Sequence, residues 1–489
     1  MFVSHTFLVF SKNLQKNKKC VIIVMLILES KRERNKMEKE YFESVPVPKA
    51  IAKFAIPTVL SQMVTLIYNL ADTFFVGHTN NPDQVAALTL SFPLFMLMVA
   101  IANLMGIGAN SLMSRSLGLK KPEQAKHASA FGFYGGIVVA VLYSLSLLIF
   151  MRPILETIGA SSNTYDYTSN YLTWTVVIGG VPMVMNMVMG HLIRAEGNSK
   201  QAGIGMALGG VINILLDPVL VLWLGWGIEG AAIATAFSNS IGVFYFFGVI
   251  YKNRKKTVVS ISPKDVKFEK ALIADIILVG FPAALVILLG SLGNVVMTHF
   301  MAPYGDTNVA AFGLVQKVGS IAIQITVGLT QGIMPLVGYN FAAGNHSRTH
   351  EVCRDAFILI IGYAVLCLTA IELFPRAVIS VFIDEQQTIQ TGVDFIRRWF
   401  WCAPGMCIVL LLNSIFQAMG KWKQSMFLSI FRQGAAFIPI LIILNNTIGL
   451  YGLVWSQPIS DTLTLIVGGV LYILMVRAQK REETKIQKA

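Results

Sequence analysis

Charged residues are scarce in this 489-residue sequence: they make up 13% of it, while hydrophobic residues make up 55%. Soluble domains carry about a quarter charged residues, and the mean hydropathy of +0.64 departs in the same direction. Nearly uncharged runs such as 131–150 and 228–250 are each long enough to cross a bilayer, which takes roughly 20 residues of helix. The composition therefore predicts an integral membrane protein and excludes an ordinary soluble domain.

Cysteine is also rare, with five residues that form neither a CxxC pair nor a cluster with the spacing of a zinc site. The P-loop, HExxH and GxSxG motifs are absent, which argues against ATP hydrolysis and against a membrane-embedded hydrolase. The net charge of +13 is spread over short segments between apolar runs, so it does not indicate a nucleic-acid surface. We expect no cofactor, no metal other than a coupling ion, and no nucleic-acid partner.

The first 36 residues differ from the rest of the chain. Their one apolar stretch, 20–28, is too short to span a bilayer and is flanked by basic residues. It could serve as a surface anchor. Alternatively, translation starts at Met37, directly before the first convincing span, and we favour this interpretation. No cleavage site of a signal peptide follows the stretch.

Apolar segments predict an all-α integral membrane protein with twelve transmembrane helices. They lie near residues 51–76, 84–113, 128–151, 165–193, 200–224, 228–251, 271–300, 308–338, 351–374, 389–418, 423–446 and 450–476. Lys and Arg follow the second, sixth and twelfth segments, whereas the loops 77–84, 223–229 and 303–308 contain neither. The positive-inside rule therefore places both termini, and the loop after the sixth helix, in the cytoplasm.

The two halves of the sequence repeat at an offset of 222 to 225 residues. Six matches occur in the same order: Ile56-Pro57 with Phe281-Pro282, Asn69 with Asn294, Val85-Ala86-Ala87 with Val309-Ala310-Ala311, Val181-Pro182 with Ala403-Pro404, Gly197 and Gln201 with Gly420 and Gln424, and Gly227 and Gly230 with Gly449 and Gly452. Such a repeat indicates a duplicated unit. Because each half holds an even number of helices, we expect two six-helix lobes related by a pseudo-twofold axis along the membrane normal.

The repeat and the charge pattern divide the chain into five parts. They are an N-terminal extension (1–36), an N-terminal six-helix lobe (37–251), a cytoplasmic linker (252–270), a C-terminal six-helix lobe (271–476) and a basic cytoplasmic tail (477–489). The linker carries seven basic residues and a proline, and we expect it to let the lobes move.

An ionisable residue inside a span costs roughly 2.5–3.5 kcal/mol on insertion scales, so it needs a partner or a function. Asp72 lies in the first span, and Asp217 lies in the fifth, one helical turn beyond Asn213. Pro218 weakens the helix there and frees carbonyl oxygens. The carboxylates could bind Na⁺ or share a proton. Alternatively, Asp72 caps its helix and Asp217 makes a local turn with the proline.

The second lobe has no acidic pair, and its intramembrane charges are Lys317, Arg432 and Asp461. We favour an ion-paired group that fixes helix packing, although Lys317 could instead repel cationic cargo. His191 and Arg194, at the inner end of the fourth span, are expected to reach the membrane interface by snorkelling. The methionines between 183 and 189 could form a flexible ligand surface, but such stripes more often face lipid or the core.

Five segments carry a shared pattern: Ala55-Ile56-Pro57, Tyr68 to Thr73, Arg194 to Asn198, Asn213 to Pro218 and Gly230 to Thr235. Together they resemble the multidrug and toxic compound extrusion (MATE) family, and within it the bacterial multidrug efflux branch. The resemblance runs from about Met37 to the C-terminal tail. The sequence departs from other members in its N-terminal extension and in the missing acidic site of the second lobe.

The resemblance implies roles for particular residues. In family members with this first-lobe pattern, a cation site is built from the residues that match Asp72, Asn213, Asp217 and Thr235. The first helix of these members bends at the position of Pro57, and Pro218 is the second candidate for a bend. The substrate cavity carries over by spacing to Tyr68, Asn186 and Met206.

The resemblance also implies a function: a secondary active multidrug efflux transporter of the cell membrane, contributing to antibiotic resistance. It would exchange lipophilic, often cationic compounds for H⁺ or Na⁺ by alternating access, and we expect a monomer. A flippase for a lipid-linked precursor would need several cavity Arg or Lys residues to hold pyrophosphate, and only Lys317 and Arg432 qualify. A polytopic membrane enzyme is the other alternative, without a motif to support it.

Overall fold

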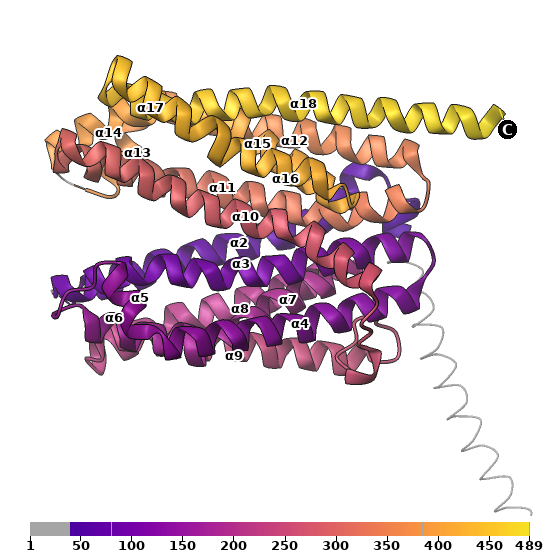
Figure 1. Cartoon of the computed structure of the whole chain (residues 1–489), viewed down its shortest axis with the longest axis horizontal. Helices are drawn as coiled ribbons and strands as arrows, with labels where there is room; N and C mark the ends of the chain where they lie inside the picture. The colour runs from indigo at the N-terminus through magenta and orange to yellow at the C-terminus, as the bar shows by residue number, and fades with distance from the viewer. Residues whose placement is uncertain (1–39, 80, 384, 489) are drawn as a thin grey trace, which may run out of the picture. The chain divides into compact units, whose positions relative to one another are not determined.

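The computed structural model describes residues 40–79, 81–383 and 385–488, with side chains as far as Arg481 (Figure 1). The predicted N-terminal extension (1–36) and its alternative start at Met37 therefore lie outside the described residues. The chain divides into two units, Met1–Ala50 and Ile51–Ala489. The first helix, α2, begins in the first unit, and all later helices belong to the second.

The described residues form helices and turns, with no strand among them. Ten helical runs are long and apolar enough to cross a membrane. They are α2 (Val47–Gly77), α3 (Pro82–Gly118), α4 (Pro122–Ile149), α8 (Ser199–Asp217) with the π-helical turn η2 (Pro218–Trp223), α9 (Gly227–Asn253), α10 (Lys270–Met301) with η4 (Ala302–Tyr304), α11 (Asp306–Ala342), α12 (His346–Leu373), α16 (Trp422–Ile430) with η5 (Phe431–Ala436) and α17 (Phe437–Ile448), and α18 (Leu450–Lys488).

Two further spans are bent, each at one break. The first joins α6 (Tyr165–Leu172) and η1 (Thr173–Ile178) to α7 (Gly180–Ala195) at 47°, and the second joins α14 (Gln386–Trp399) to α15 (Cys402–Ala418) at 51°. Pro182 and Pro404 follow these breaks in the first turn of the second helix, where proline is best tolerated. With each bent pair counted as one span, the twelve predicted helices are confirmed. Short helices α5 (Met151–Thr157), α13 (Pro375–Ser380) and η3 (Pro263–Asp265) lie between them.

Within the unit from Ile51 on, α3 to α9 form one bundle and α10 to α18 form another, as Figure 1 shows in indigo to magenta and in salmon to yellow. The core of the first bundle is built from buried apolar residues of α3, α4, α7 and α9, among them Met98, Met105, Leu192 and Phe246. The two-lobe fold expected from the repeat is thereby confirmed.

The bundles meet through glycine contacts between α3 and α10. A Cβ at Gly280 in α10 would overlap the carbonyl oxygen of Leu104, and a Cβ at Gly108 in α3 would overlap that of Ile276. Only glycine lets two helix backbones approach this closely. The extensive packing of α3 on α10 therefore depends on these two positions.

The same arrangement recurs between α2 and α11. A Cβ at Gly328 would lie 2.6 Å from the Cα of Val59, and a Cβ at Gly332 would lie 2.5 Å from the Cα of Ala55. Gly332 is the repeat counterpart of Gly108 in α3. The first helix of each lobe thus packs against the second helix of the other lobe, so the duplication in the sequence produces a duplicated contact between lobes.

Polar contacts reinforce this junction at the end predicted to be cytoplasmic. Arg115 at the end of α3 donates from Nη2 to Asp275 Oδ1 of α10 at 2.8 Å. One turn earlier, the hydroxyl of Ser111 donates to the backbone carbonyl of Gln417 in α15 at 2.5 Å. The two lobes are therefore joined by charge as well as by packing on this side.

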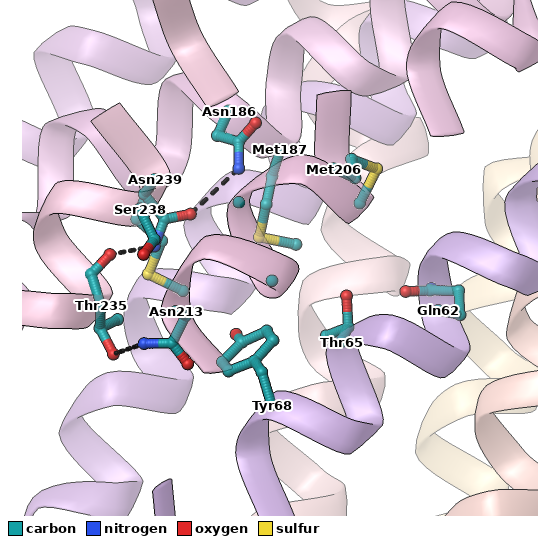
Figure 2. Close-up of a pocket in the computed structure, with 13 residues that line it drawn as sticks. Gln62, Thr65, Tyr68, Asn186, Met187, Met206, Asn213, Thr235, Ser238 and Asn239 are labelled. Atoms are coloured by element: carbon teal, nitrogen blue, oxygen red, sulfur yellow. Dashed lines mark hydrogen bonds between the residues drawn. The ribbon is translucent and has the colours of Figure 1, made fainter. Parts of the chain in front are cut away.

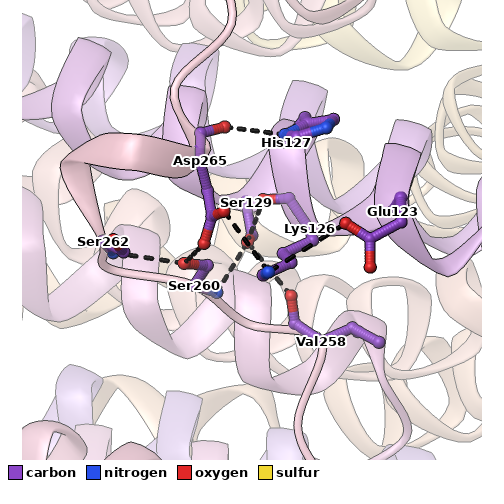
Figure 3. A network of polar contacts seen from close by, with 8 residues as sticks. All are labelled: Glu123, Lys126, His127, Ser129, Val258, Ser260, Ser262 and Asp265. Atoms are coloured by element: carbon purple, nitrogen blue, oxygen red, sulfur yellow. Dashed lines mark hydrogen bonds and ion pairs between the residues drawn. The ribbon is translucent and has the colours of Figure 1, made fainter.

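The predicted linker is held against the first bundle (Figure 3). Asp265 accepts a hydrogen bond from Ser260 at 2.5 Å and pairs with Lys126 Nζ at 3.3 Å. Ser129 of α4 donates to the carbonyl of Val258 and accepts from the amide of Ser260. The hydroxyl of Ser260, followed by the ammonium of Lys126, keeps the pKa of the Asp265 carboxyl below its ordinary value. The segment 258–265 is therefore attached to α4, and the role of the linker in movement between the lobes stays a prediction.

Candidate cation and substrate site

The four predicted cation-site residues come from three helices and lie together. Asn213 Nδ2 donates to Thr235 Oγ1 at 3.3 Å and lies 3.5 Å from Asp217 Oδ1. The carboxyl of Asp72 lies beside the side chains of Asp217, Asn213 and Thr235. All four residues are buried, with Asp217 fully so. The structure thus gathers two carboxyls, an amide and a hydroxyl at one point between α2, α8 and α9.

Small residues of α8 allow this grouping because they let α2 approach. A Cβ at Gly210 would lie 2.7 Å from Val64 of α2, and a Cβ at Gly203, two turns earlier on the same face, would lie 2.6 Å from the carbonyl oxygen of Pro57. Asp72 continues the same helix beyond Val64 and therefore reaches Asp217. The glycines of α8 are the structural reason why two carboxyls can share one site.

Three oxygen atoms of this cluster lack a partner. Asp72 Oδ1, Asn213 Oδ1 and Asp217 Oδ2 are buried and accept no hydrogen bond from any described residue. Buried polar atoms are nearly always satisfied, and two neighbouring carboxyls out of water need a positive partner. Carboxylate and amide oxygens are hard ligands of the kind that alkali and alkaline-earth cations prefer. The cluster fits a proton or a Na⁺ ion.

The structure also bears on the alternative interpretations of the two aspartates. Asp72 lies inside α2, which continues to Gly77, so its position is not that of a helix cap. Asp217 is the last residue of α8, and the helix changes to the π-helical turn η2 at Pro218. Proline has no amide hydrogen and cannot donate a backbone hydrogen bond. The change of helix type therefore occurs at the residue where the sequence predicted weakened helical hydrogen bonding.

A pocket adjoins the cluster (Figure 2). The three residues predicted to bind substrate, Tyr68, Asn186 and Met206, all line it, and so do Asn213 and Thr235. The cation cluster and the pocket therefore share two side chains. A cation that neutralises the cluster can therefore affect a ligand in the pocket through these shared residues.

Sequence reasoning missed the other lining residues. They are Gln62, Thr65, Met183, Met187, Gly209, Gly210, Ser238 and Asn239. Helical spacing could have found two of them, since Thr65 lies three residues before Tyr68 and Asn239 lies four residues after Thr235. Met183 and Met187 belong to the methionine stripe, whose pocket-facing and core-facing members the sequence alone does not separate.

A hydrogen-bonded chain connects the cluster to the far wall of the pocket. Asn239 donates to the backbone carbonyl of Thr235 at 2.9 Å, and Asn186 Nδ2 donates to Asn239 Oδ1 at 3.0 Å (Figure 2). Asn186 Oδ1 is buried and accepts nothing from the described residues. The chain therefore ends at the side chain of Asn186, whose Oδ1 faces Gly242 of α9.

The charges of the second lobe are arranged differently. Arg432 and Asp461 form a two-point ion pair, with Nε–Oδ1 at 2.7 Å and Nη2–Oδ2 at 3.3 Å, and both residues are buried. Lys317 is exposed and forms no ion pair with any described residue. The pair agrees with the favoured packing role, but Lys317 does not belong to it.

The expectation for His191 and Arg194 was wrong. Both were predicted to snorkel to the interface, yet they are 1% and 0% exposed. The end of α7 is enclosed by α3, α8 and α9, so these side chains have no path to the interface.

A family model and known proteins match this chain. The MatE family model matches residues 57–219 and again 282–443, so the family unit occurs twice at the offset of the internal repeat. Multidrug export protein MepA of Staphylococcus aureus (strain NCTC 8325 / PS 47) is 30% identical over 435 residues, which are 89% of this chain and 95% of that protein. MepA of Staphylococcus haemolyticus (strain JCSC1435) is 30% identical over 423 residues, 86% and 92% of the two chains.

Solved structures agree in fold. A crystal structure of MATE in the straight conformation has a TM-score of 0.85 at 24% identity and covers 90% of this chain and 98% of that chain. An outward-facing conformation of a multidrug resistance MATE family transporter of the MOP superfamily has a TM-score of 0.83 at 24% identity, with the same coverage. At these identities the similarity concerns the fold alone.

Proposed function

Because this chain belongs to the MatE family and is a multidrug efflux transporter, we propose that it exports lipophilic, often cationic compounds in exchange for H⁺ or Na⁺. One observation carries the proposal: the pocket and the cluster of unpartnered oxygens share Asn213 and Thr235. A cationic cargo and a coupling cation then depend on the same negative charge. Each weakens the binding of the other, and linkage makes this effect reciprocal.

The proposed cycle follows from this competition. Without a coupling ion, the carboxyls of Asp72 and Asp217 carry negative charge that attracts a cationic cargo into the pocket. An ion arriving from outside supplies the missing partner of the cluster, removes the attraction and releases the cargo. An inward gradient of that ion therefore drives export. The site needs no cofactor for any of these steps.

Helix α2 couples the two events mechanically in this proposal. Tyr68 of the pocket and Asp72 of the cluster lie one turn apart on α2, so a movement of one moves the other. Pro57 leaves the helix without one amide donor, and its carbonyl faces Gly203 of α8 at the closest approach of the two helices. We propose Pro57 as the point about which the outer part of α2 bends to shrink the pocket, with Pro218 as the corresponding weak point of α8.

The second lobe does not take part in ion coupling. Its buried charges, Arg432 and Asp461, neutralise each other, and they serve packing. We further propose a monomer in the cell membrane with both termini in the cytoplasm, as the distribution of Lys and Arg indicates. In this proposal the first lobe ends at residue 251 and the second begins at residue 271. The lobes move relative to each other at the glycine contacts between them.

Transport measured in proteoliposomes tests the proposal. The purified protein is reconstituted, a pH gradient or a Na⁺ gradient is imposed separately, and movement of ethidium, a fluorescent lipophilic cation, is followed. We expect one of the two gradients to drive ethidium against its own gradient, and that gradient identifies the ion. If ethidium moves equally with and without either gradient, the exchange mechanism is wrong.

A further inference from the structure

Arg194 at the end of α7 is the largest side chain that is fully buried in the described part of the protein. Its guanidinium donates to Gln331 Oε1 at 3.2 Å, to His191 Nδ1 at 3.3 Å and to the sulfur of Met206 at 3.4 Å. All three acceptors are uncharged. Its Nε is buried and has no acceptor.

No carboxylate of the described residues pairs with Arg194. The neighbouring Glu196 is turned toward the linker, where it accepts hydrogen bonds from Thr257 and from the amide of Val258. A buried charge without a counter-ion costs several kcal/mol. Arg432 of the second lobe, by contrast, has Asp461 at 2.7 Å. Of the two arginines that are buried among the described residues, Arg194 alone therefore lacks a carboxylate partner, and its charge needs an explanation.

The position of Arg194 next to the pocket suggests a functional role for its charge. Met206, whose sulfur contacts the guanidinium, lines the pocket, so the positive charge lies directly behind the pocket wall. Figure 2 shows Met206 on one side of the pocket and Asn213 with Thr235 on the other. Along α8, Met206 precedes Asn213 by two turns and Asp217 by three, which is about 10 and 16 Å. The pocket thus has a negative end at the carboxyls and a positive end at Arg194.

We propose that Arg194 is a specificity-determining residue of the pocket. It holds the charge of a cationic cargo at the carboxyl end and places the apolar part of the cargo against Met206. It disfavours elongated compounds that carry a second cationic group at their far end. This inference rests on the proposed export of cationic compounds and adds which of them are preferred.

The structure offers an isosteric way to cancel this charge without removing the arginine. Gln331, on α11 of the other lobe, already accepts a hydrogen bond from Arg194. Gln331→Glu keeps that bond and adds the missing counter-ion. Arg194→Gln removes the charge directly, and Arg194→Lys retains it. Gln331→Leu breaks the contact between the lobes without changing any charge and serves as the matched control.

The measurement is transport in proteoliposomes of two cargoes, an N-decylquinolinium ion and the bis-quinolinium ion with a decamethylene linker. The readout is the ratio of their kcat/KM values, which a general loss of stability or amount of protein does not alter. We expect Gln331→Glu and Arg194→Gln each to raise the ratio of bis-cation to mono-cation by about tenfold, the size of a Coulomb interaction a little beyond 10 Å at an effective dielectric constant of about 20. Arg194→Lys and Gln331→Leu should leave the ratio near that of the wild type.

The outcomes separate this inference from the proposed function. If the mono-cation is transported and the ratio is unchanged in both Gln331→Glu and Arg194→Gln, the specificity role is wrong and the export proposal stands. If Gln331→Leu raises the ratio as much as Gln331→Glu, the contact between lobes matters and the charge does not, which also overturns the inference. If the wild type transports neither cargo, both proposals fail.

Discussion

Three residues of the candidate site each have a buried side-chain oxygen atom without a hydrogen-bond donor among the described residues. These unpartnered oxygen atoms are the main physical feature of the site. Asp72, Asn213 and Asp217 each contribute one such atom, while the hydroxyl of Thr235 is within reach of Asn213 and Asp72. In a medium without water, every missing partner costs free energy. If these oxygens bind the coupling ion as proposed, we expect the affinity for that ion to depend on each of them.

Thr235 gives the cleanest test of this sensitivity. Thr235→Val keeps the shape of the side chain but removes the hydroxyl, so we expect the ion concentration for half-maximal transport to rise about tenfold, as expected for one lost hydrogen bond to a charged group. Thr235→Ser retains the hydroxyl and should behave like the wild type. The measurement is ethidium transport in proteoliposomes at increasing concentrations of the coupling ion. Equal values for the Val and Ser variants would remove Thr235 from the site.

The ion pair of the second lobe leads to a different expectation. Arg432→Met leaves Asp461 buried and unpaired, which should lower the free energy of unfolding by about 3–5 kcal/mol. The double variant Arg432→Met/Asp461→Leu removes both charges and should recover most of this loss. Thermal unfolding in detergent measures the stability, and ethidium transport measures the function. A stable double variant without transport would show that the pair does more than pack helices.

Residue-level reasoning from sequence selected side chains that the structure brings together where a charge stands alone in an apolar span, and their role as a cation site stays a prediction. Asp72 and Asp217 were identified because an isolated carboxyl there is costly, and Asn213 followed from helical spacing. Arg194 was misinterpreted for a related reason. At the end of a span, the sequence does not distinguish a side chain that reaches the interface from one that neighbouring helices enclose, and only the packing of α7 decides between them.

Helices meet across the lobes at glycines, and these contacts decide how closely the elements approach. Gly108 and Gly280 join α3 to α10, and Gly328 and Gly332 join α11 to α2. Contacts without side chains leave the junction smooth, which suits helices that slide or separate. The repeat of the sequence predicted equivalent helices, but it did not predict this exchange of partners between lobes, because contacts between distant helices leave no periodic pattern along the chain.

Gly280 offers a matched comparison within one helix. Gly280→Val forces the backbone of α3 away from α10 and should destabilise the protein by about 1–3 kcal/mol, the usual cost of overpacking. Gly290, also in α10, faces open space, so Gly290→Val is the control and should have little effect. Thermal unfolding of the two variants in the same detergent decides the matter. Equal stabilities would mean that α3 and α10 are not tightly packed in solution.

The linker provides a prediction that depends on pH. The partners of Asp265 lower its pKa, so the ionised carboxyl stabilises the attachment of the linker above the ordinary aspartate pKa of about 3.9. This contribution is lost as the pH falls through the lowered value. Asp265→Asn should therefore speed hydrogen exchange of residues 258–265 about fivefold at pH 7, a loss of roughly 1 kcal/mol.

Glu123→Gln is the control for this measurement, because it removes an exposed carboxyl 4.0 Å from the same Lys126. Exchange measured by mass spectrometry should be unchanged in that variant. Unchanged exchange in Asp265→Asn would mean that the backbone contacts with Ser129 hold the linker without the carboxyl.

The molecule consists of two similar lobes to which the proposed cycle assigns different tasks. The two matches of the family model are separated by the same offset as the sequence repeat. The twelve spans were predictable because each is a long apolar run. The difference between the lobes was also visible in the sequence, since only the first carries two isolated carboxyls. The first lobe therefore binds both ion and cargo in the proposed cycle, and the second provides a partner against which the first can move.

The most direct test of this division is an exchange measured in the reverse direction. An ethidium gradient is imposed across proteoliposomes that hold the wild type, Asp72→Asn or Asp217→Asn at equal amounts, and the opposing flux of H⁺ or Na⁺ is recorded with an internal pH dye or with labelled sodium. We predict that ethidium drives an opposing ion flux through the wild type and that each substitution abolishes it. An undiminished ion flux through either variant would contradict the claim that the carboxyls of the first lobe couple ion entry to export.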